Sequence, residues 1–143
     1  MPNASNNVPF SDKNISASNK VLLIGGGGFV GINLAKKLDQ AGYDVYILDE
    51  RQYSQEVLQY ASYVGCDVLN LKGMHEIFAQ IAPIECVIHL ASAGMSGGKM
   101  IDYHTFKVNV HGTQNVINCC LRNETTSLIY ISTYNVTFGG QCI

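Results

Sequence analysis

The chain has 143 residues, of which 47% are hydrophobic and 14% are charged, with a formal net charge of −2. This length corresponds to about one domain with a sizeable core, and the charge excludes the basic surface that is typical of nucleic-acid-binding proteins. The apolar runs are shorter than the ~18 residues of a transmembrane helix, and five cysteines without a Cys-x-x-Cys pair favour reduced thiols and no metal site.

The first 19 residues differ in composition from the rest of the chain. They are rich in Asn and Ser and lack the apolar segment and the basic start of a secretory signal. We therefore expect residues 1–19 to be a disordered lead and residues 20–143 to form a single domain. The expected location is the cytoplasm, or the cytosolic face of a membrane if a longer form carries a carboxyl-terminal anchor.

A short apolar run leads into four consecutive glycines. Val21–Ile24 predicts a buried strand, and the apolar spacing over 30–41 predicts the helix that follows it. Gly25, Gly28 and Gly31 have the spacing of a dinucleotide-binding turn, in which glycines allow a tight turn, a close approach to pyrophosphate and close packing of helix and strand. The N–H groups at the helix start would bind the phosphate. The alternative is an ordinary tight turn.

An acidic residue ends the next predicted strand, 45–48. Asp49 lies 18 residues after Gly31, where a carboxylate would accept hydrogen bonds from the adenosine ribose hydroxyls. A 2′-phosphate about 4 Å from this carboxylate would be repelled by ~1–4 kcal/mol. Asp49 therefore favours NAD over NADP, although Arg51 could partly offset the repulsion. The alternative is a turn residue at a strand end.

The remaining chain alternates strands with helices. Apolar runs predict strands at 63–66, 86–90 and 128–131, and helical spacing predicts helices over 74–81 and 106–121. Residues 52–60 are typical of a linker or a short helix, and 92–99 of a flexible loop. One face of the last helix is lined by Phe106, Val110, Thr113, Ile117 and Leu121. The alternation predicts an α/β fold, a Rossmann-type parallel sheet in strand order 3-2-1-4-5 with helices on both faces.

Several phrases of the sequence are together similar to one family of enzymes. IGGGGFVG, LDE, GCDV, VIHLAS, VNVHGTQNV and ISTYNVTFGG resemble the extended short-chain dehydrogenase/reductases, and within them the 3-beta-hydroxysteroid dehydrogenase/isomerase family. ASAGMSGG and STYNVTFGGQ are most similar to its subfamily 42E. The resemblance covers residues 20–143. It implies an NAD-dependent oxidoreductase that acts on the CH–OH group of a 3-beta-hydroxysteroid or a sterol-like alcohol.

The resemblance also implies roles for residues outside the glycine turn. Phe29 joins the cofactor-binding residues, Asp67 and Val68 hold the adenine ring, Leu90, Ala91 and Ser92 run under the ribose and nicotinamide, and Asn109 bridges the backbone and an active-site water. From the residues alone, Asp67 could instead be a turn aspartate and Asn109 a helix-surface residue. His89, on an apolar strand, is interpreted as a packed core histidine.

The resemblance places the active-site hydroxyl at Thr133, at the carboxyl end of the fifth strand, with Ser132 as the alternative. The family also needs a Tyr, and a Lys four residues later, that follow this position and move the substrate proton. Tyr103 and Lys107 have this spacing but precede Thr133, and any helix places i and i+4 on one face. We therefore expect an amino-terminal part of such an enzyme, truncated before the remaining strands and the substrate region, that binds cofactor without turnover.

Two other functions would use the same motifs. The chain could be a non-catalytic NAD-binding sensor or interaction module, or part of a nucleotide-sugar epimerase or reductase. The expected partners are the dinucleotide, a steroid or other small-molecule alcohol in the full-length protein, and a second copy in a homodimer, with no nucleic acid. The fifth strand predicts the homodimer, because an apolar sheet edge with unpaired backbone groups invites self-association.

Overall fold

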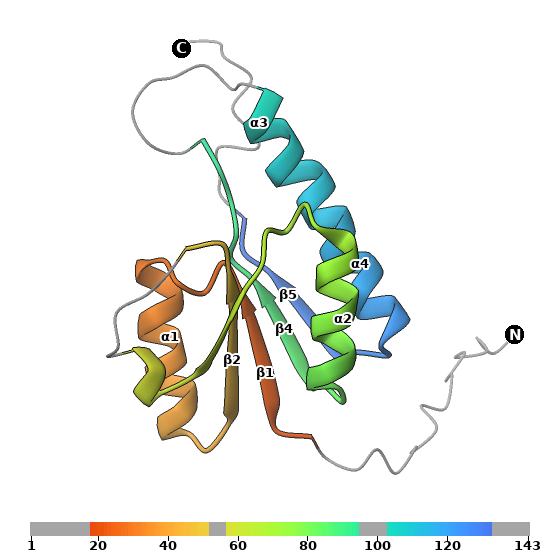
Figure 1. Cartoon of the computed structure of the whole chain (residues 1–143). Coiled ribbons are helices and arrows are strands. Elements are labelled where there is room, and N and C mark those ends of the chain that lie inside the picture. Colours follow the sequence, from red (N-terminus) through yellow and green to blue (C-terminus); the bar gives the residue numbers. More distant parts are fainter. Residues whose placement is uncertain (1–17, 52–56, 95–102, 133–143) are drawn as a thin grey trace, which may run out of the picture.

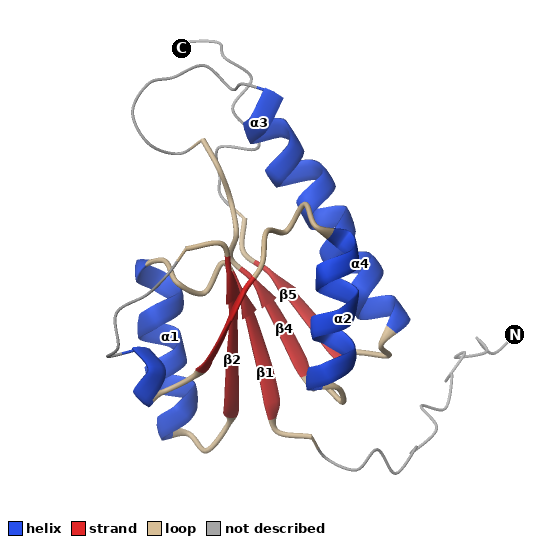
Figure 2. Ribbon diagram, viewed as in Figure 1, coloured by secondary structure: helices blue, strands red, loops and turns tan. Residues whose placement is uncertain are grey.

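The computed structural model describes residues 18–51, 57–94 and 103–132, which form a five-stranded parallel sheet between two layers of helices (Figures 1 and 2). The strand order is β3-β2-β1-β4-β5, and every neighbouring pair is parallel. The strands are β1 (Lys20–Ile24), β2 (Asp44–Asp49), β3 (Ser62–Gly65), β4 (Cys86–His89) and β5 (Ser127–Tyr130). The α/β class and the strand order expected from the sequence are confirmed.

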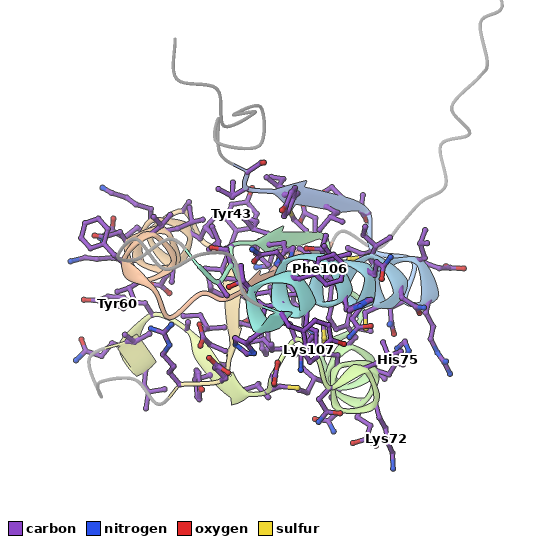
Figure 3. All side chains as sticks on the ribbon, turned by 90° about the horizontal axis from the view of Figure 1, so that it is seen from above. Tyr43, Tyr60, Lys72, His75, Phe106 and Lys107 are labelled. Carbon is purple, nitrogen blue, oxygen red and sulfur yellow. The ribbon has the colours of Figure 1, made fainter. Side chains whose placement is uncertain are left out.

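Helices cover both faces of the sheet. On one face lies α1 (Phe29–Gln40), and on the other lie α2 (Leu71–Ile81) and a longer helix made of α3 (Tyr103–Phe106), the π-helical segment η2 (Lys107–Gly112) and α4 (Thr113–Arg122). Figure 3 looks from above and shows α1 and the helix that carries Phe106 and Lys107 on opposite sides of the strands. A short 3-10 turn, η1 (Val57–Gln59), precedes β3.

The core consists of two apolar clusters, one on each face of the sheet. Side chains alternate along a strand, so Leu22 and Ile24 of β1 pack toward α2 and α4, whereas Val21 and Leu23 pack toward α1. Three of these β1 side chains are 0% exposed. A strand that is buried on both faces is apolar at every position, which explains why β1 and β2 are continuous apolar runs in the sequence.

The last helix is longer than the sequence pattern predicts, and it turns a different face to the sheet. It starts at Tyr103, not at residue 106, and passes through a π-helical turn before α4 ends at Arg122. The buried side consists mainly of small residues: Thr105, Gly112, Val116, Cys119 and Cys120. The bulkier residues of the pattern, Phe106, Val110, Ile117 and Leu121, are exposed. Small side chains allow close approach to the sheet, which the apolar spacing alone did not indicate.

Element boundaries differ from the expected ones by a few residues. Helix α2 begins three residues earlier than expected because Asn70 caps it, and its side-chain Oδ1 accepts a hydrogen bond of 3.0 Å from the Gly73 N–H. Residues 1–17 of the expected lead, 52–56 of the expected linker and 95–99 of the expected loop lie outside the described residues. None of the helices within the described ranges has the length and hydrophobicity needed to cross a bilayer.

Candidate functional site

A cavity of about 470 Å³ lies beyond the carboxyl ends of the strands. Chain order in the sheet reverses between β1 and β4, and the crevice at such a reversal is where open α/β sheets bind ligands. Eight of the residues that the sequence predicts to bind the cofactor line the cavity: Gly25, Gly28, Asp49, Asp67, Val68, Leu90, Ala91 and Ser92. Eight others also line it: Leu48, Glu50, Arg51, Cys66, Ala93, Gly94, His104 and Val108.

The structure requires glycine at two of the three motif positions and leaves space at the third. Gly25 has φ +75°, and a Cβ there would lie 2.5 Å from the Ala91 backbone. A Cβ on Gly31 would lie 2.2 Å from the Gly26 carbonyl oxygen, so only glycine lets α1 pack this closely on the turn. A Cβ on Gly28 would meet only the Gly25 carbonyl oxygen, at 3.8 Å. The space at Gly28 is therefore open toward the cavity.

The start of α1 faces the same cavity. Helix α1 begins at Phe29, and no side chain caps its first N–H groups or places a negative charge in its first turn. Uncapped N–H groups at a helix start attract anions such as phosphate. The ring of Phe29 is 85% exposed, and Phe29 does not line the cavity. The backbone of Phe29, at the first position of the helix, is the part that could contact a ligand.

Asp49 connects the glycine turn to the end of β2. Its Oδ2 accepts a hydrogen bond of 3.2 Å from the Gly27 N–H, and its Oδ1 accepts one of 3.2 Å from the Arg51 N–H. These two bonds hold the carboxylate at the cavity wall beside Gly25 and Gly28. Each carboxylate oxygen has a second lone pair that can accept a hydroxyl.

Asp67 and Val68 line the cavity after β3. The Oδ1 of Asp67 accepts a hydrogen bond of 2.8 Å from the Leu69 N–H, so this aspartate also stabilises its own turn. Val68 is buried, and its carbonyl oxygen accepts a hydrogen bond of 2.9 Å from the side-chain amide of Asn115 on α4. Beside them, burial and then the charge of Asp67 raise the pKa of the Cys66 thiol.

Asn109 holds the loop after β4 to the π-helical segment. Its Oδ1 accepts a hydrogen bond of 2.9 Å from the Ala93 N–H, and its Nδ2 donates a hydrogen bond of 3.0 Å to the Ala93 carbonyl oxygen. The Asn109 carbonyl in turn accepts 2.8 Å from the Thr113 hydroxyl. The side chain of Asn109 is thus bound to the backbone of a loop that lines the cavity, and π-helical turns of this kind occur often at functional sites.

His89 is a core residue at the end of β4. It is 1% exposed, and its Nε2 lies 3.0 Å from the Thr113 hydroxyl oxygen. Because that hydroxyl donates to Asn109, Nε2 of His89 is the donor in this bond and carries the proton. Burial lowers the pKa of His89 to about 4, so the ring is neutral near pH 7. Its Nδ1 has no hydrogen-bond partner among the described residues.

Tyr103 and Lys107, the Tyr–Lys pair that precedes Thr133, do not line the cavity. Tyr103 is 73% exposed, and the Lys107 ammonium lies 5.1 Å from the centroid of its ring, a surface cation–π contact. His104 and Val108, from the same stretch, line the cavity. Thr133 lies outside the described residues, and Ser132 beside it is exposed. Within the described ranges, no cluster of three His, Cys, Asp or Glu side chains could hold a metal ion.

Comparisons with known proteins identify a family for this chain. Residues 22–143 match the model of the 3-beta hydroxysteroid dehydrogenase/isomerase family. Short-chain dehydrogenase/reductase family 42E member 1 of Homo sapiens is 37% identical over 133 residues, which are 92% of this chain and 34% of that protein. Its Mus musculus counterpart is 38% identical over 124 residues, 86% of this chain and 32% of that one. The chain thus spans about a third of the length of these relatives.

A solved structure shares the fold. UDP-glucose 4-epimerase from Brucella ovis, in complex with NAD, superposes with a TM-score of 0.75 and 30% identity over 88% of this chain and 39% of that one.

Proposed function

Because the chain belongs to the 3-beta hydroxysteroid dehydrogenase/isomerase family, we propose that it binds NAD(H) in the cavity at the carboxyl ends of the strands. It would be the cofactor-binding part of an oxidoreductase that acts on the CH–OH group of a 3-beta-hydroxysteroid or a sterol-like alcohol. The observation that carries the proposal is the carboxylate of Asp49, which is hydrogen-bonded to the glycine turn and lies on the same cavity wall as Gly28.

Each part of the cavity wall suits one part of the dinucleotide. The pyrophosphate would lie against Gly28 and the uncapped N–H groups of α1. Asp49 would accept hydrogen bonds from the adenosine ribose hydroxyls, and Asp67 with Val68 would flank the adenine. The nicotinamide half would lie along Leu90–Ser92, a segment that Asn109 supports through Ala93. The bound cofactor would supply the hydride acceptor or donor of the reaction.

The phosphate-binding role of the turn is tested by Gly28→Val. We expect this variant to keep the melting temperature of the parent, because the nearest atom to a Cβ at this position is 3.8 Å away. It should lose NADH binding, measured by cofactor fluorescence, because the side chain fills the space that the pyrophosphate needs. A variant that binds NADH as tightly as the parent would show that the turn does not hold phosphate.

The preference for NAD is tested by Asp49→Ala. The parent should bind NADH more tightly than NADPH, because the Asp49 carboxylate repels a 2′-phosphate. Removing the charge should lower this preference by roughly tenfold. Equal affinities of the parent for the two dinucleotides would contradict the role of Asp49.

We propose further that the chain alone binds cofactor without turnover. Thr133 would orient a substrate hydroxyl, but among the described residues no Tyr–Lys pair lines the cavity to move its proton, a step typically worth 10²–10⁴-fold. NADH production from a 3-beta-hydroxysteroid should therefore stay at background. Turnover that is lost in Tyr103→Phe would overturn this part of the proposal.

A nucleotide-sugar epimerase is the second candidate for the full-length protein, because the epimerase from Brucella ovis shares the fold at 30% identity. Incubating a full-length form with UDP-glucose and, separately, with a 3-beta-hydroxysteroid would distinguish the two.

The location in the cytoplasm stays a proposal. So does the homodimer, which the half-exposed apolar side chains of β5 support and which sedimentation of the purified chain would test.

A further inference from the structure

A tyrosine of β3 touches the turn that carries Asp49. Tyr63 pairs in register with Ile47 of β2 and packs, partly buried, in the cluster under α1. Its hydroxyl reaches two residues further along β2 and lies 2.8 Å from the Asp49 carbonyl oxygen. The same hydroxyl also contacts the Arg51 carbonyl oxygen. The single hydroxyl hydrogen of Tyr63 is therefore shared between the backbone carbonyls at the two ends of the turn 49–51.

The turn 49–51 is held on several sides, and Tyr63 is its support from β3. The Asp49 carboxylate binds the Gly27 and Arg51 N–H groups, and the Asp49 carbonyl accepts 3.0 Å from the Cys66 N–H as well as the Tyr63 hydroxyl. Among the described contacts, the Arg51 carbonyl is held by Tyr63. All three residues of the turn line the cavity.

The direction of this turn decides which charge faces the ligand. Asp49 and Arg51 are two residues apart and have opposite effects on a 2′-phosphate, because the carboxylate repels it and the guanidinium attracts it. Specificity is a difference between two affinities, so it changes when the relative position of these two groups changes. A group that fixes the backbone at both 49 and 51 controls that position.

We propose that Tyr63 is a specificity-determining positioning residue for the adenosine ribose. Its hydroxyl holds the turn so that the Asp49 carboxylate, and not the Arg51 guanidinium, faces the 2′ position. Tyr63 does not touch the ligand in this role; it acts through the backbone of residues 49 and 51. The inference rests on the proposed binding of NAD(H), and it adds a residue that discriminates between the two dinucleotides.

The test compares Tyr63→Phe with the parent by titrating NADH and NADPH. Phenylalanine keeps the ring and its packing and removes only the hydroxyl. The ratio of the NADPH to the NADH dissociation constant should fall by about fivefold, which corresponds to the ~1 kcal/mol of one hydrogen bond. The ratio is taken within one variant, so a partly unfolded sample lowers both affinities equally and leaves the ratio unchanged.

Tyr46→Phe is the matched control. Its hydroxyl lies 3.1 Å from a carboxylate oxygen of Asp44, at the amino end of β2 and far along the strand from the turn. The ratio should be unchanged in this variant. In the background of Asp49→Ala, Tyr63→Phe should have no further effect on the repulsive part of the ratio, because that part has already been removed. Tyr63→Leu, which also lacks the hydroxyl, replaces Tyr63→Phe if the latter does not fold.

The outcomes separate the two proposals. A parent that binds neither dinucleotide refutes the proposed function and this inference with it. A parent that prefers NADH, together with a parental ratio in Tyr63→Phe, refutes only the role of Tyr63. An equal fall of the ratio in Tyr46→Phe would also refute it, because the effect would then come from the loss of any tyrosine hydroxyl on the sheet.

Discussion

The centre of the sheet and its β5 margin have similar sequences and different surroundings. Strands β1 and β2 lie between neighbours on both sides and are covered on both faces, and Ile47 of β2 is 0% exposed. Strand β5 is just as apolar, yet it pairs with β4 alone within the described residues, and Ile129 is 47% exposed. An apolar run therefore predicts a strand, but its burial depends on which elements cover it.

The largest expected effect is a difference in the free energy of unfolding between alanine variants of Ile47 and Ile129. Ile47 and Ile129 lie on the same face of the sheet, because Ile129 pairs with Ile88, which packs in the cluster under α1 with Ile47. Ile47→Ala should lower the free energy of unfolding by about 2–5 kcal/mol. Ile129→Ala should cost less than ~1 kcal/mol because its side chain is half in water. Urea denaturation measures both, and equal losses would mean that β5 is covered in solution, as self-association would require.

A second pair of variants tests how tightly the glycine turn is packed against the centre. Gly31→Ala should cost about 3 kcal/mol, the upper end for overpacking, because its Cβ would overlap backbone atoms of Gly26 that cannot move independently. Gly28→Ala should melt close to the parent, because its Cβ meets nothing nearer than 3.8 Å. Thermal melting of the two proteins gives the comparison. A tolerated alanine at position 31 would show that α1 can move away from the turn.

His89 tests the boundary between the two regions, because it lies at the end of β4 beside Tyr130 of β5, with ring centroids 5.4 Å apart. Its pKa in the folded protein is about 4, below the ordinary 6.5, so the unfolded chain binds the proton more tightly. The stabilisation is complete above about pH 6.5 and is lost as the pH falls toward 4. Between about pH 8 and pH 5 the free energy of unfolding should fall by about 2 kcal/mol.

This acid sensitivity should be absent in His89→Gln and kept in His111→Gln, since His111 is exposed on η2. Unfolding curves at the two pH values, measured for all three proteins, provide the comparison. The same loss of stability in His89→Gln would mean that other titrating groups, and not proton uptake by His89, cause it.

The sequence predicted the parts of the site that depend on local order. Gly25, Gly28 and Gly31 stand in one strand–turn–helix unit, and Asp49 ends the next strand, so their spacing alone places them together. His104 and Val108 were missed because they come from a helix far along the chain. The role proposed for Tyr63 was also missed, because in an apolar strand it is indistinguishable from a residue that only packs.

The last helix shows why a regular pattern can fail. The π-helical turn at 107–112 contains more residues than a turn of α-helix. The side chains that follow it are therefore shifted around the helix axis. Asn109, which contacts Ala93, lies within this segment, and the spacing of the apolar residues could not predict its contact. The exposed side of the helix, with Phe106 and Leu121, was equally hidden, because small residues and not large ones face the sheet.

The carboxamide of Asn109 behaves as a substitute peptide group. It accepts from the N–H of Ala93 and donates to the carbonyl of the same residue, as the backbone of a neighbouring strand would do. A helix thus supplies one unit of sheet pairing to a loop that has passed the end of its strand. Aspartate has no N–H to donate, and glutamine carries its amide one methylene further out. Asparagine is therefore the side chain that mimics the backbone at this distance. Through it, the position of the helix fixes the position of Ala93 in the cavity wall.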